Sequence, residues 1–400
     1  MARGWMRLVA AVAATIVVSG GSTALAEEPE RADGPTRTAG GTEAAEVVIS
    51  MPDLGITHRL ANGGMNLFRM PLSELEDGYG EIDTVRTLST GGFSFDRSQT
   101  LTGDFGDLTP YDDGTADHIV WHGAADGSIR LWAIAGGADS TPRLWYTLRA
   151  PFTYANARPM VGDITGDGWE DLVVRLWRGC NGSTCYSDVW AFISNGRVLQ
   201  APRRLVNGQD TLANWRDSRN LLADVDGDGD KDWLSVVGTA GPGYDTTVRL
   251  STGTTFAAPG GPAFSASGAS LGFATTRTLA GDVTGDGAAD LVTIARSGAT
   301  GLAVWVQEAG MSAVQWQDLT SGGWSFAGSR QYLADTDADG ALDLVSVHRS
   351  SGTGLLVWRH VSNGTSAFAA PDNVADLRTR GWNWSLSREG VADTIGVIVV

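Results

Sequence analysis

Acidic residues recur at a fixed spacing in four short stretches of the chain. Each stretch places oxygen-bearing side chains at positions one, three, five and nine, with glycine at position six. These side chains are Asp163, Thr165, Asp167 and Asp171; Asp224, Asp226, Asp228 and Asp232; Asp282, Thr284, Asp286 and Asp290; and Asp335, Asp337, Asp339 and Asp343. Position seven, which offers a backbone carbonyl, is occupied by Trp169, Asp230, Ala288 and Ala341.

This spacing predicts a calcium site in each of the four loops. Calcium takes about six to eight oxygen ligands, and alternate side chains of a curled loop can converge on one point. The glycine permits the sharp turn that this convergence needs. Magnesium favours a tighter octahedron with fewer protein ligands. The alternative is an Asp/Gly turn without metal, in which the crowded carboxylates would repel one another.

A fifth copy of the loop carries an insertion of five residues. It begins at Asp104 and ends at Asp117, with Asp113 and Thr115 between them. It lacks an obvious ligand at position three, and Asp107 or Asp112 from the insertion could substitute there. We predict a fifth, altered calcium site here. A sixth copy, residues 387–393, has lost the loop, so we expect no calcium there.

An EF-hand begins with the same acidic pattern but requires Glu at position twelve. The four loops have Val174, Ser235, Thr293 and Ser346 at that position. The residues around them are mostly Leu, Val, Ile and Thr in short runs, which favour strands over helices. The sequence therefore predicts calcium loops between strands.

Other candidate chemistry is sparse. Ser270 lies in a Gly-x-Ser-x-Gly pattern, but a Ser/Gly-rich segment precedes it where an esterase would have an apolar strand. His118 and His122 lie on one face of an expected strand about 13 Å apart, too far to share a metal ion. We expect these and the other histidines to pack in the fold or to lie on the surface. Cys180 and Cys185 flank a turn and predict a disulfide across a hairpin tip, with two free thiols as the alternative.

The loops recur at the period of a propeller blade. Successive copies begin 59, 61, 58, 53 and 58 residues apart, from Gly103 to Ala392. A blade of four short strands needs about 40–50 residues, and longer connections bring it towards 60. Second strands are predicted at 172–175, 291–295 and 344–348, and third strands with a central tryptophan at 129–132, 189–190, 302–305 and 355–358. We expect these tryptophans to pack the blades, with sugar stacking as the alternative.

The predicted fold is an all-β propeller of six blades. A ring closed by strands from both chain ends leaves no exposed sheet edge. Residues 393–400 begin a unit that they cannot finish, and Val47–Met51 and Gly64–Met70 read as later strands that lack a beginning. Seven blades is the alternative if residues 56–90 contain further strands.

The chain begins with a predicted secretory signal at residues 1–26, with Arg3 and Arg7, an apolar run at 8–18 and cleavage after Ala26. Residues 27–46 are predicted to be a disordered spacer and 47–400 the propeller. No later apolar run is long enough to span a bilayer as a helix. Losing the signal takes the formal charge from −17 to −19, which disfavours nucleic acid as a partner.

The loops resemble the FG-GAP/VCBS repeats of integrin α-chain heads, some fungal lectins and many secreted bacterial proteins. The resemblance covers nearly all of residues 47–400, and the insertion in the first loop and the loss of the sixth depart from it. It implies a β-propeller in which calcium loops rigidify one rim, with the ligands given above.

Propellers of this kind bind sugars, bind proteins or support catalysis. We favour a monomeric, non-catalytic module that binds a glycan or an extracellular protein, with Trp169 as a sugar-stacking candidate. The first alternative is an extracellular hydrolase or lyase that acts on polysaccharide or ester in the central channel. The second is a structural scaffold of the cell envelope.

Overall fold

A computed structural model describes residues 46–50, 53–72, 82–89, 92–106, 116–136, 140–181, 184–208, 218–260, 264–350, 352, 354–378, 382–392 and 395–399. The predicted signal and nearly all of the predicted spacer lie outside these residues, so both stay predictions. The described residues form six four-stranded antiparallel sheets and one two-stranded sheet, with four short 3-10 turns.

The six larger sheets are the blades, numbered here by the order of their acidic loops. Blade 1 contains β5 (Ser98–Gly103), β6 (Asp117–Gly123), β7 (Ile129–Ile134) and β8 (Arg143–Leu148). Blade 2 contains β9 (Ala157–Gly162), β10 (Asp171–Asn181), β11 (Thr184–Phe192) and β12 (Arg203–Val206). Blade 3 contains β13 (Ser218–Ala223), β14 (Asp232–Gly238), β15 (Gly243–Arg249) and β16 (Ser265–Ser267).

The remaining blades follow the same order. Blade 4 contains β17 (Thr276–Gly281), β18 (Asp290–Ser297), β19 (Gly301–Gln307) and β20 (Val314–Leu319). Blade 5 contains β21 (Ser329–Ala334), β22 (Asp343–Arg349), β23 (Leu355–His360) and β24 (Asp372–Asp376). Blade 6 contains β25 (Ser387–Ala392), β2 (Asp53–Arg59), β3 (Met65–Pro71) and β4 (Asp83–Leu88). The 3-10 turns are η2 (Phe95–Arg97), η4 (Ala269–Leu271), η5 (Phe273–Thr275) and η6 (Trp384–Leu386).

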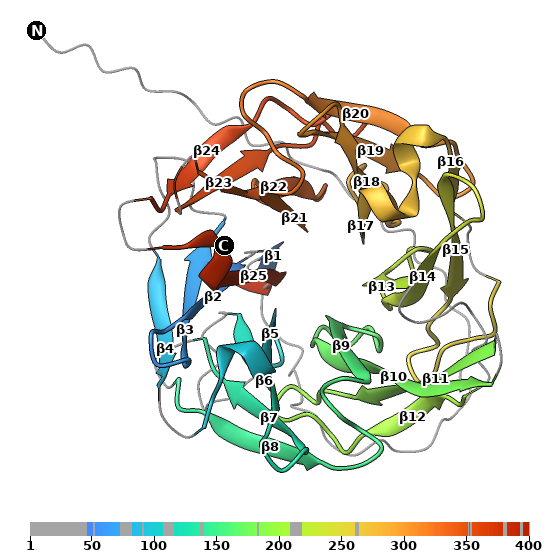
Figure 1. Ribbon diagram of the computed structural model, residues 1–400. Coiled ribbons are helices and arrows are strands. Elements are labelled where there is room, and N and C mark those ends of the chain that lie inside the picture. Colours follow the sequence, from blue (N-terminus) through green and yellow to red (C-terminus); the bar gives the residue numbers. More distant parts are fainter. Residues whose placement is uncertain are drawn as a thin grey trace, which may run out of the picture. The chain divides into compact units, whose positions relative to one another are not determined.

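The blades are arranged around a central axis, with the first strand of each blade innermost (Figure 1). The inner strands contact one another in the order β5, β9, β13, β17, β21, β25 and back to β5. Blade 6 combines β25, from the last part of the described chain, with three strands from its first part, because β25 pairs with β2. The six-bladed, all-β prediction is confirmed, and each predicted second and third strand lies within a strand of its blade.

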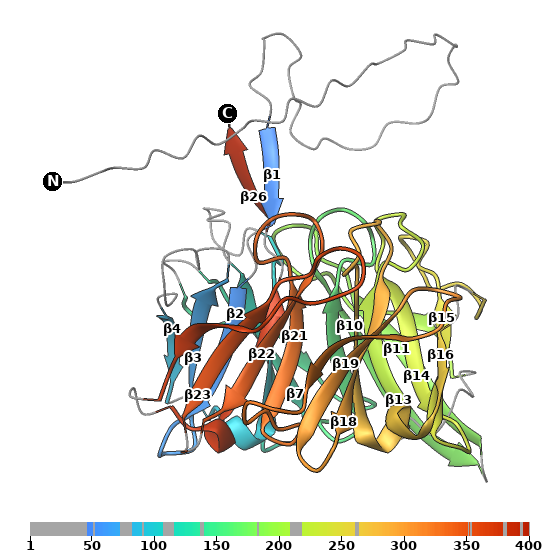
Figure 2. The same cartoon turned by 90° about the horizontal axis from the view of Figure 1, so that it is seen from above.

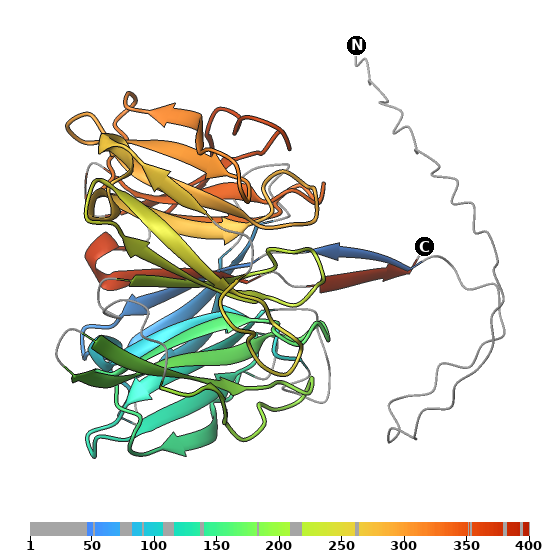
Figure 3. The same ribbon diagram turned by 90° about the vertical axis from the view of Figure 1, so that its right-hand side faces the viewer.

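One strand prediction is wrong. Residues 47–51 were expected to be a later strand of a blade, but β1 (Glu46–Ser50) belongs to none of the six. It pairs instead with β26 (Ile395–Val399), and the two form a separate two-stranded sheet (Figures 2 and 3). The second strand of blade 6 is β2, so β26 does not continue that blade. A local sequence pattern cannot show whether β1 and β26 belong to a blade or pair with each other, because both are short apolar runs.

The core lies between the blades. Six clusters of buried apolar side chains each join two neighbouring blades, and together they complete the circuit. The second strand of a blade is therefore packed on both faces, and every residue of β6 is buried. Such strands read as nearly continuous apolar runs.

A backbone bulge directs the aromatic side chain in the middle of the third strands. In five blades the pairing of the third and fourth strands shifts by one residue immediately before the aromatic side chain. The five residues are Phe68, Trp132, Trp190, Trp305 and Trp358. A bulge re-aims the side chain that follows it. In four blades this side chain contacts an aromatic ring of the segment that enters the same blade.

Arginines on first strands connect successive blades. Arg219, Arg277, Arg330 and Arg388 lie over Phe273, Phe326, Trp384 and Phe95 of the next blade, with the guanidinium carbon 3.9–4.2 Å from the ring centroid. Each also donates to backbone carbonyls of that neighbour. We call this contact the arginine clamp.

The predicted disulfide between Cys180 and Cys185 is confirmed, and it joins paired residues of the β10–β11 hairpin. None of the described helical segments is long and apolar enough to cross a membrane.

Candidate metal centres

The first aspartate of each loop holds the loop backbone. In the blade 3 loop, Asp224 Oδ1 accepts from the amides of Gly227 and Asp228 at 2.7 and 3.2 Å, and Asp224 Oδ2 accepts from Gly229 at 2.8 Å. Asp163, Asp282 and Asp335 accept from the amides of their own loops in the same way. The glycine at position six has a positive φ in all four loops, between 89° and 95°. This left-handed conformation is what glycine adopts most easily.

The ninth aspartate ties each loop to the strands. Asp232 Oδ2 accepts from the amide of Val225 at position two, and its Oδ1 accepts from Ser251 at 2.6 Å, beyond the third strand. Asp171 and Asp343 make the same two contacts with their own blades. This carboxylate is buried in all four loops because it begins the second strand, between two blades.

Three carboxylates converge in two of the loops. Oxygens of Asp224, Asp226 and Asp228 lie within 4.8 Å of one another, and so do oxygens of Asp335, Asp337 and Asp339. The ninth aspartates are not part of these groups. The blade 2 and blade 4 loops have threonine at position three, and its hydroxyl donates to the first aspartate at 3.2 Å. In the loops of blades 3 and 5 the structure brings together positions one, three and five, but it does not bring the predicted ligand at position nine into the same group.

Burial and crowding make the loops unfavourable for negative charge. Burial raises the pKa of Asp171 to about 8 and that of Asp290 to about 7, and neighbouring carboxylates add to both shifts. Burial also raises the pKa values of Asp232 and Asp343 to about 6. A cation among these oxygens would favour their ionised form.

In the altered loop of blade 1, the first and last aspartates still accept hydrogen bonds from backbone amides, as in the other loops. Asp117 Oδ2 accepts from the amide of Phe105 and Oδ1 from that of Gly136, at 3.3 and 3.2 Å. Asp104 accepts from Gly106 at 3.0 Å. The candidate ligands Asp107, Asp112, Asp113 and Thr115 lie outside the described residues.

Blade 6 retains the aspartate that begins the second strand. The sequence does not reveal it, because this strand lies far along the chain from the first strand of the blade. Its second strand begins with Asp53, as the other second strands begin with Asp117, Asp171, Asp232, Asp290 and Asp343. Asp53 pairs in register with Ala392, the residue before Asp393. It lies 3.9 Å from Arg69 and accepts from the amide of Ala116 in blade 1. Asp393 lies outside the described residues.

The loops are also connected to one another around the ring. The amide at position eight of one loop donates to the carbonyl of the first aspartate in the preceding loop, at 2.7 Å in each case. The donors Glu170, Lys231, Ala289 and Leu342 pair with Asp104, Asp163, Asp224 and Asp282. Anything that fixes one loop therefore fixes part of the contact between two blades.

A set of serines completes this network and was not predicted from the sequence. Ser194, Ser251 and Ser362 donate their hydroxyls to the position-two carbonyl of the preceding loop, at 2.7–2.8 Å. The available signal was the pattern Ser-x-Gly at residues 194–196, 251–253 and 362–364. In blades 2 and 5 this serine follows the third-strand tryptophan by four residues.

No family model matches the chain, and no curated protein matches it. Among solved structures it is similar to the fucose-specific lectin from Aleuria aurantia, with 13% identity, a TM-score of 0.46 and coverage of 86% of this chain and 100% of that chain. It is also similar to AofleA from Arthrobotrys oligospora, with 10% identity, a TM-score of 0.46 and coverage of 89% and 94%. The number of blades given above comes from the strand pairing of this chain itself.

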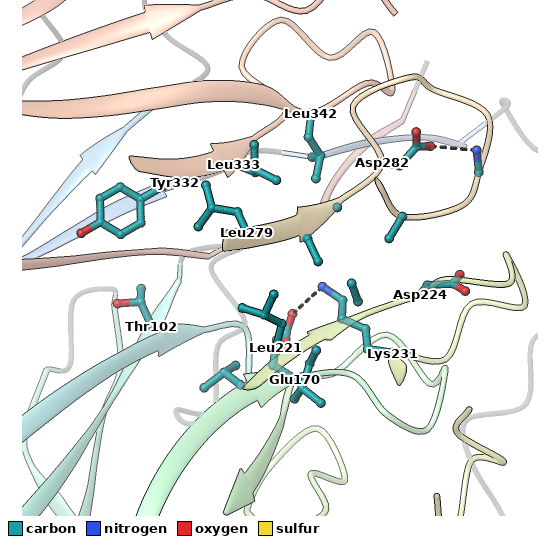
Figure 4. A pocket seen from close by; sticks show the side chains of 17 residues that line it. Thr102, Glu170, Leu221, Asp224, Lys231, Leu279, Asp282, Tyr332, Leu333 and Leu342 are labelled. Carbon is teal, nitrogen blue, oxygen red and sulfur yellow. Dashed lines mark hydrogen bonds and ion pairs between the residues drawn. The ribbon is translucent and has the colours of Figure 1, made fainter. Parts of the chain in front are cut away.

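The central channel near the loops is largely apolar. Figure 4 shows the side chains around it, among them Leu221, Leu279, Leu333 and Leu342. Glu170 and Lys231, from the loops of the neighbouring blades 2 and 3, form an ion pair in its wall at 3.7 Å. Further along the first strands, Glu389 Oε2 accepts from Arg330 at 2.6 Å, and burial raises the pKa of Glu389.

The remaining candidates do not form a catalytic arrangement in the described residues. Ser270 lies in the 3-10 turn η4, whereas a nucleophile elbow needs a turn from strand to helix. His118 and His122 are buried on β6 and contact the hydroxyls of Thr102 and Ser98. Trp169 is half-buried, and its indole lies against Gly196.

Proposed function

We propose that this chain is a secreted, calcium-stabilised propeller that acts as a non-catalytic binding module for an extracellular glycan or protein. The observation that carries the calcium part is the convergence of three carboxylates in each of two loops. The disulfide and the predicted signal support export. We also propose that the acidic loops are FG-GAP/VCBS-type repeats, which they resemble in sequence.

The donor set fits calcium. The loops offer carboxylate, hydroxyl and backbone oxygens and no nitrogen or sulfur, which is the chemistry of a hard cation. Asp224, Asp226 and Asp228 would hold the ion in blade 3, and Asp335, Asp337 and Asp339 in blade 5. In blades 2 and 4, Thr165 and Thr284 would replace the third-position carboxylate. The first aspartate can serve both purposes, because its Oδ2 accepts a single amide and therefore retains a lone pair.

The proposed role of the ion is structural. When bound, calcium neutralises the carboxylates that crowd each loop. The loops are hydrogen-bonded to those of the preceding blades, so a rigid loop stabilises the contact between blades. We propose that the pairing of β25 with β2 closes this ring, since it covers the edge that β2 would otherwise expose.

A non-catalytic role is supported by the acids of the channel. A glycosidase uses a pair of carboxylates flanking the bond to be cleaved. Among the described residues that line the channel, Glu170 is paired with Lys231, Glu389 is paired with Arg330, and the others belong to the loops. This arrangement favours a binding module over the hydrolase alternative.

A glycan array tests this proposal, with the whole chain probed in calcium and again after chelation. We expect a defined set of glycans to be retained in calcium and lost or weakened in chelator, because the blades lose their fixed arrangement. No retained glycan in calcium would contradict a lectin role and favour a protein-binding module or an envelope scaffold. Cleavage of an arrayed glycan would favour the enzyme.

A further inference from the structure

The rim opposite the acidic loops carries a hollow in blade 5. It lies where β22 ends and the segment before β21 enters the blade, and it encloses about 1150 Å³ including its open mouth. Trp324, Trp358, His348, Arg349 and Arg378 contribute to its lining. None of the described metal candidates is among the residues that line it.

The two indole rings in this hollow pack against each other, and one of them also packs against two histidines. Trp324 meets His348 edge-on, with ring centroids 5.2 Å apart, and contacts the buried His360 at 5.3 Å. It also meets Trp358 at 5.6 Å with the planes tilted by 59°. Neither tryptophan is fully buried. Two fixed indoles in one hollow suit a pyranose, whose C–H groups pack against the negative face of an aromatic ring.

The hollow also carries a positive charge that none of the described carboxylates neutralises. Arg349 is exposed, and its hydrogen bond goes from Nε to the carbonyl of Gly352 at 3.5 Å. Arg378 is paired with Asp376, with Nε 2.8 Å from Oδ1. No carboxylate of the described residues forms an ion pair with Arg349. On a chain with a formal charge of −17, such a cation favours an anionic ligand.

Blade 6 carries a second hollow at the equivalent place. Trp382 replaces Trp324, Phe68 replaces Trp358, and His58 and Arg59 replace His348 and Arg349. His58 meets Trp382 edge-on at 5.4 Å, as in blade 5. Here the arginine is neutralised, because Arg59 pairs with Asp96 at 2.9 Å. The two hollows therefore share aromatic, histidine and arginine positions in their lining and differ in charge.

We propose that the blade 5 hollow binds a carboxylated pyranose, the uronate residue of an acidic polysaccharide. The sugar ring lies against Trp324 and Trp358, and its carboxylate pairs with Arg349. Guanidinium is suited to this contact, since it presents two parallel N–H donors to a carboxylate. This inference rests on the glycan-binding function proposed above and names the class of sugar.

Calorimetry with oligogalacturonate and its methyl ester tests the proposal on the whole chain in calcium. The ester keeps the pyranose and removes the charge. We expect the acid to bind at least about tenfold more tightly than the ester, the usual effect of a hydrogen-bonded ion pair. Equal affinities would overturn the proposal, and this comparison needs no variant.

Matched variants then locate the site. Arg349→Gln is expected to weaken binding of the acid to about the level of the ester and to leave the ester unchanged. Trp358→Ala is expected to weaken both forms. Arg59→Gln in blade 6 is the control and should change neither. Acid binding that survives Arg349→Gln, or that falls equally in Arg59→Gln, would overturn the assignment.

The outcomes separate this inference from the function on which it rests. If the array retains neutral glycans and the chain binds acid and ester equally, the lectin role stands and the uronate site fails. If the array retains no glycan and neither oligosaccharide binds, the lectin role and the uronate site both fail, and the protein-binding module or the scaffold is favoured.

Discussion

Ala338 occupies a place that glycine occupies in three equivalent loops. Position four is Gly166, Gly227 or Gly285 in those loops, with φ between 66° and 76°. Ala338 has φ 59° and is the one non-glycine residue of the described chain with a positive φ. For a residue with a Cβ atom this conformation costs about 1–2 kcal/mol.

Ala338→Gly should therefore stabilise the propeller. Relief of the backbone strain exceeds the extra flexibility that glycine gives to the unfolded chain, which costs about 0.4–1 kcal/mol. We expect a net gain of about 0.5–1 kcal/mol in the free energy of unfolding, measured by urea denaturation. The reverse change, Gly227→Ala, should destabilise, and a loss of stability in Ala338→Gly would contradict this account of the loop.

His360 predicts a contribution to acid sensitivity. It is fully buried against Trp324, and burial lowers its pKa to about 3, so the folded protein holds it neutral. Below its ordinary pKa of 6.5 the unfolded chain binds a proton that the folded chain refuses, and stability falls as pH falls. The loss approaches about 1.4 kcal/mol per pH unit between the two pKa values.

We expect His360→Phe to remove this loss. Denaturation at pH 7.5 and pH 4.5 should show a smaller difference in the variant than in the unmodified chain. His58→Phe is a useful comparison, because burial lowers the pKa of His58 but that histidine is only half-buried. An equal pH dependence in His360→Phe and the unmodified chain would show that His360 is not the group responsible.

At the scale of the elements, blades are joined by side chains of the inner strands as well as by the apolar clusters. The arginine clamp recurs because a Ser or Thr followed by Arg begins four of the first strands. The pattern was visible in the sequence, but its function was not. A clamp depends on which blade lies next to the strand, and only the assembled ring shows that.

Arg277→Ala should weaken the contact between blades 4 and 5. Arg277 donates to the carbonyls of Phe326 and Ser329 at 2.6 and 2.7 Å, and its guanidinium lies over the ring of Phe326. We expect a loss of about 2–4 kcal/mol in chemical denaturation, because two buried carbonyls lose donors and a cation–π contact is lost. Arg277→Lys should restore little of the lost stability, since an ammonium lacks the planar arrangement of several N–H donors that guanidinium has. Arg203→Ala, at an exposed residue of β12, is the control, and an equal loss there would refute the clamp.

Asp286→Ala should remove one calcium site and leave the others occupied. In the blade 4 loop Asp286 is the proposed fifth-position ligand, and its carboxylate also accepts from the amide of Ala288 at 3.0 Å. Calcium titration by calorimetry should show the stoichiometry fall by one. Asp318→Ala, on the outer strand β20, is the matched control. An unchanged stoichiometry in Asp286→Ala would exclude the blade 4 loop as a site.

At the scale of the whole molecule, regular features were predictable and long-range pairings were not. The loops, the blade period, most strands and the disulfide follow from local spacing, since each depends on residues close in the chain. The place of Asp53 at the start of a second strand and the pairing of β1 with β26 join distant segments. Their register depends on the ring as a whole, so no local pattern could reveal it.

The same division applies to the candidate sites. The acidic loops repeat, and repetition made them visible. The blade 5 hollow is visible only when the fold brings Trp324, Trp358 and Arg349 together. The difference in charge between this hollow and the one in blade 6 depends on a single ion pair, that of Arg59 with Asp96, which joins residues far apart in the sequence.

The central claim is that calcium bound in the loops stabilises the ring, and thermal unfolding over a calcium titration tests it most directly. An ion bound only by the folded state adds about 2.7 kcal/mol per site at a hundredfold excess over Kd, so several sites should raise the melting temperature markedly. The account predicts a rising Tm with calcium, reversed by chelator and not reproduced by magnesium at the same concentration. A melting curve that is the same in calcium and in chelator would contradict it.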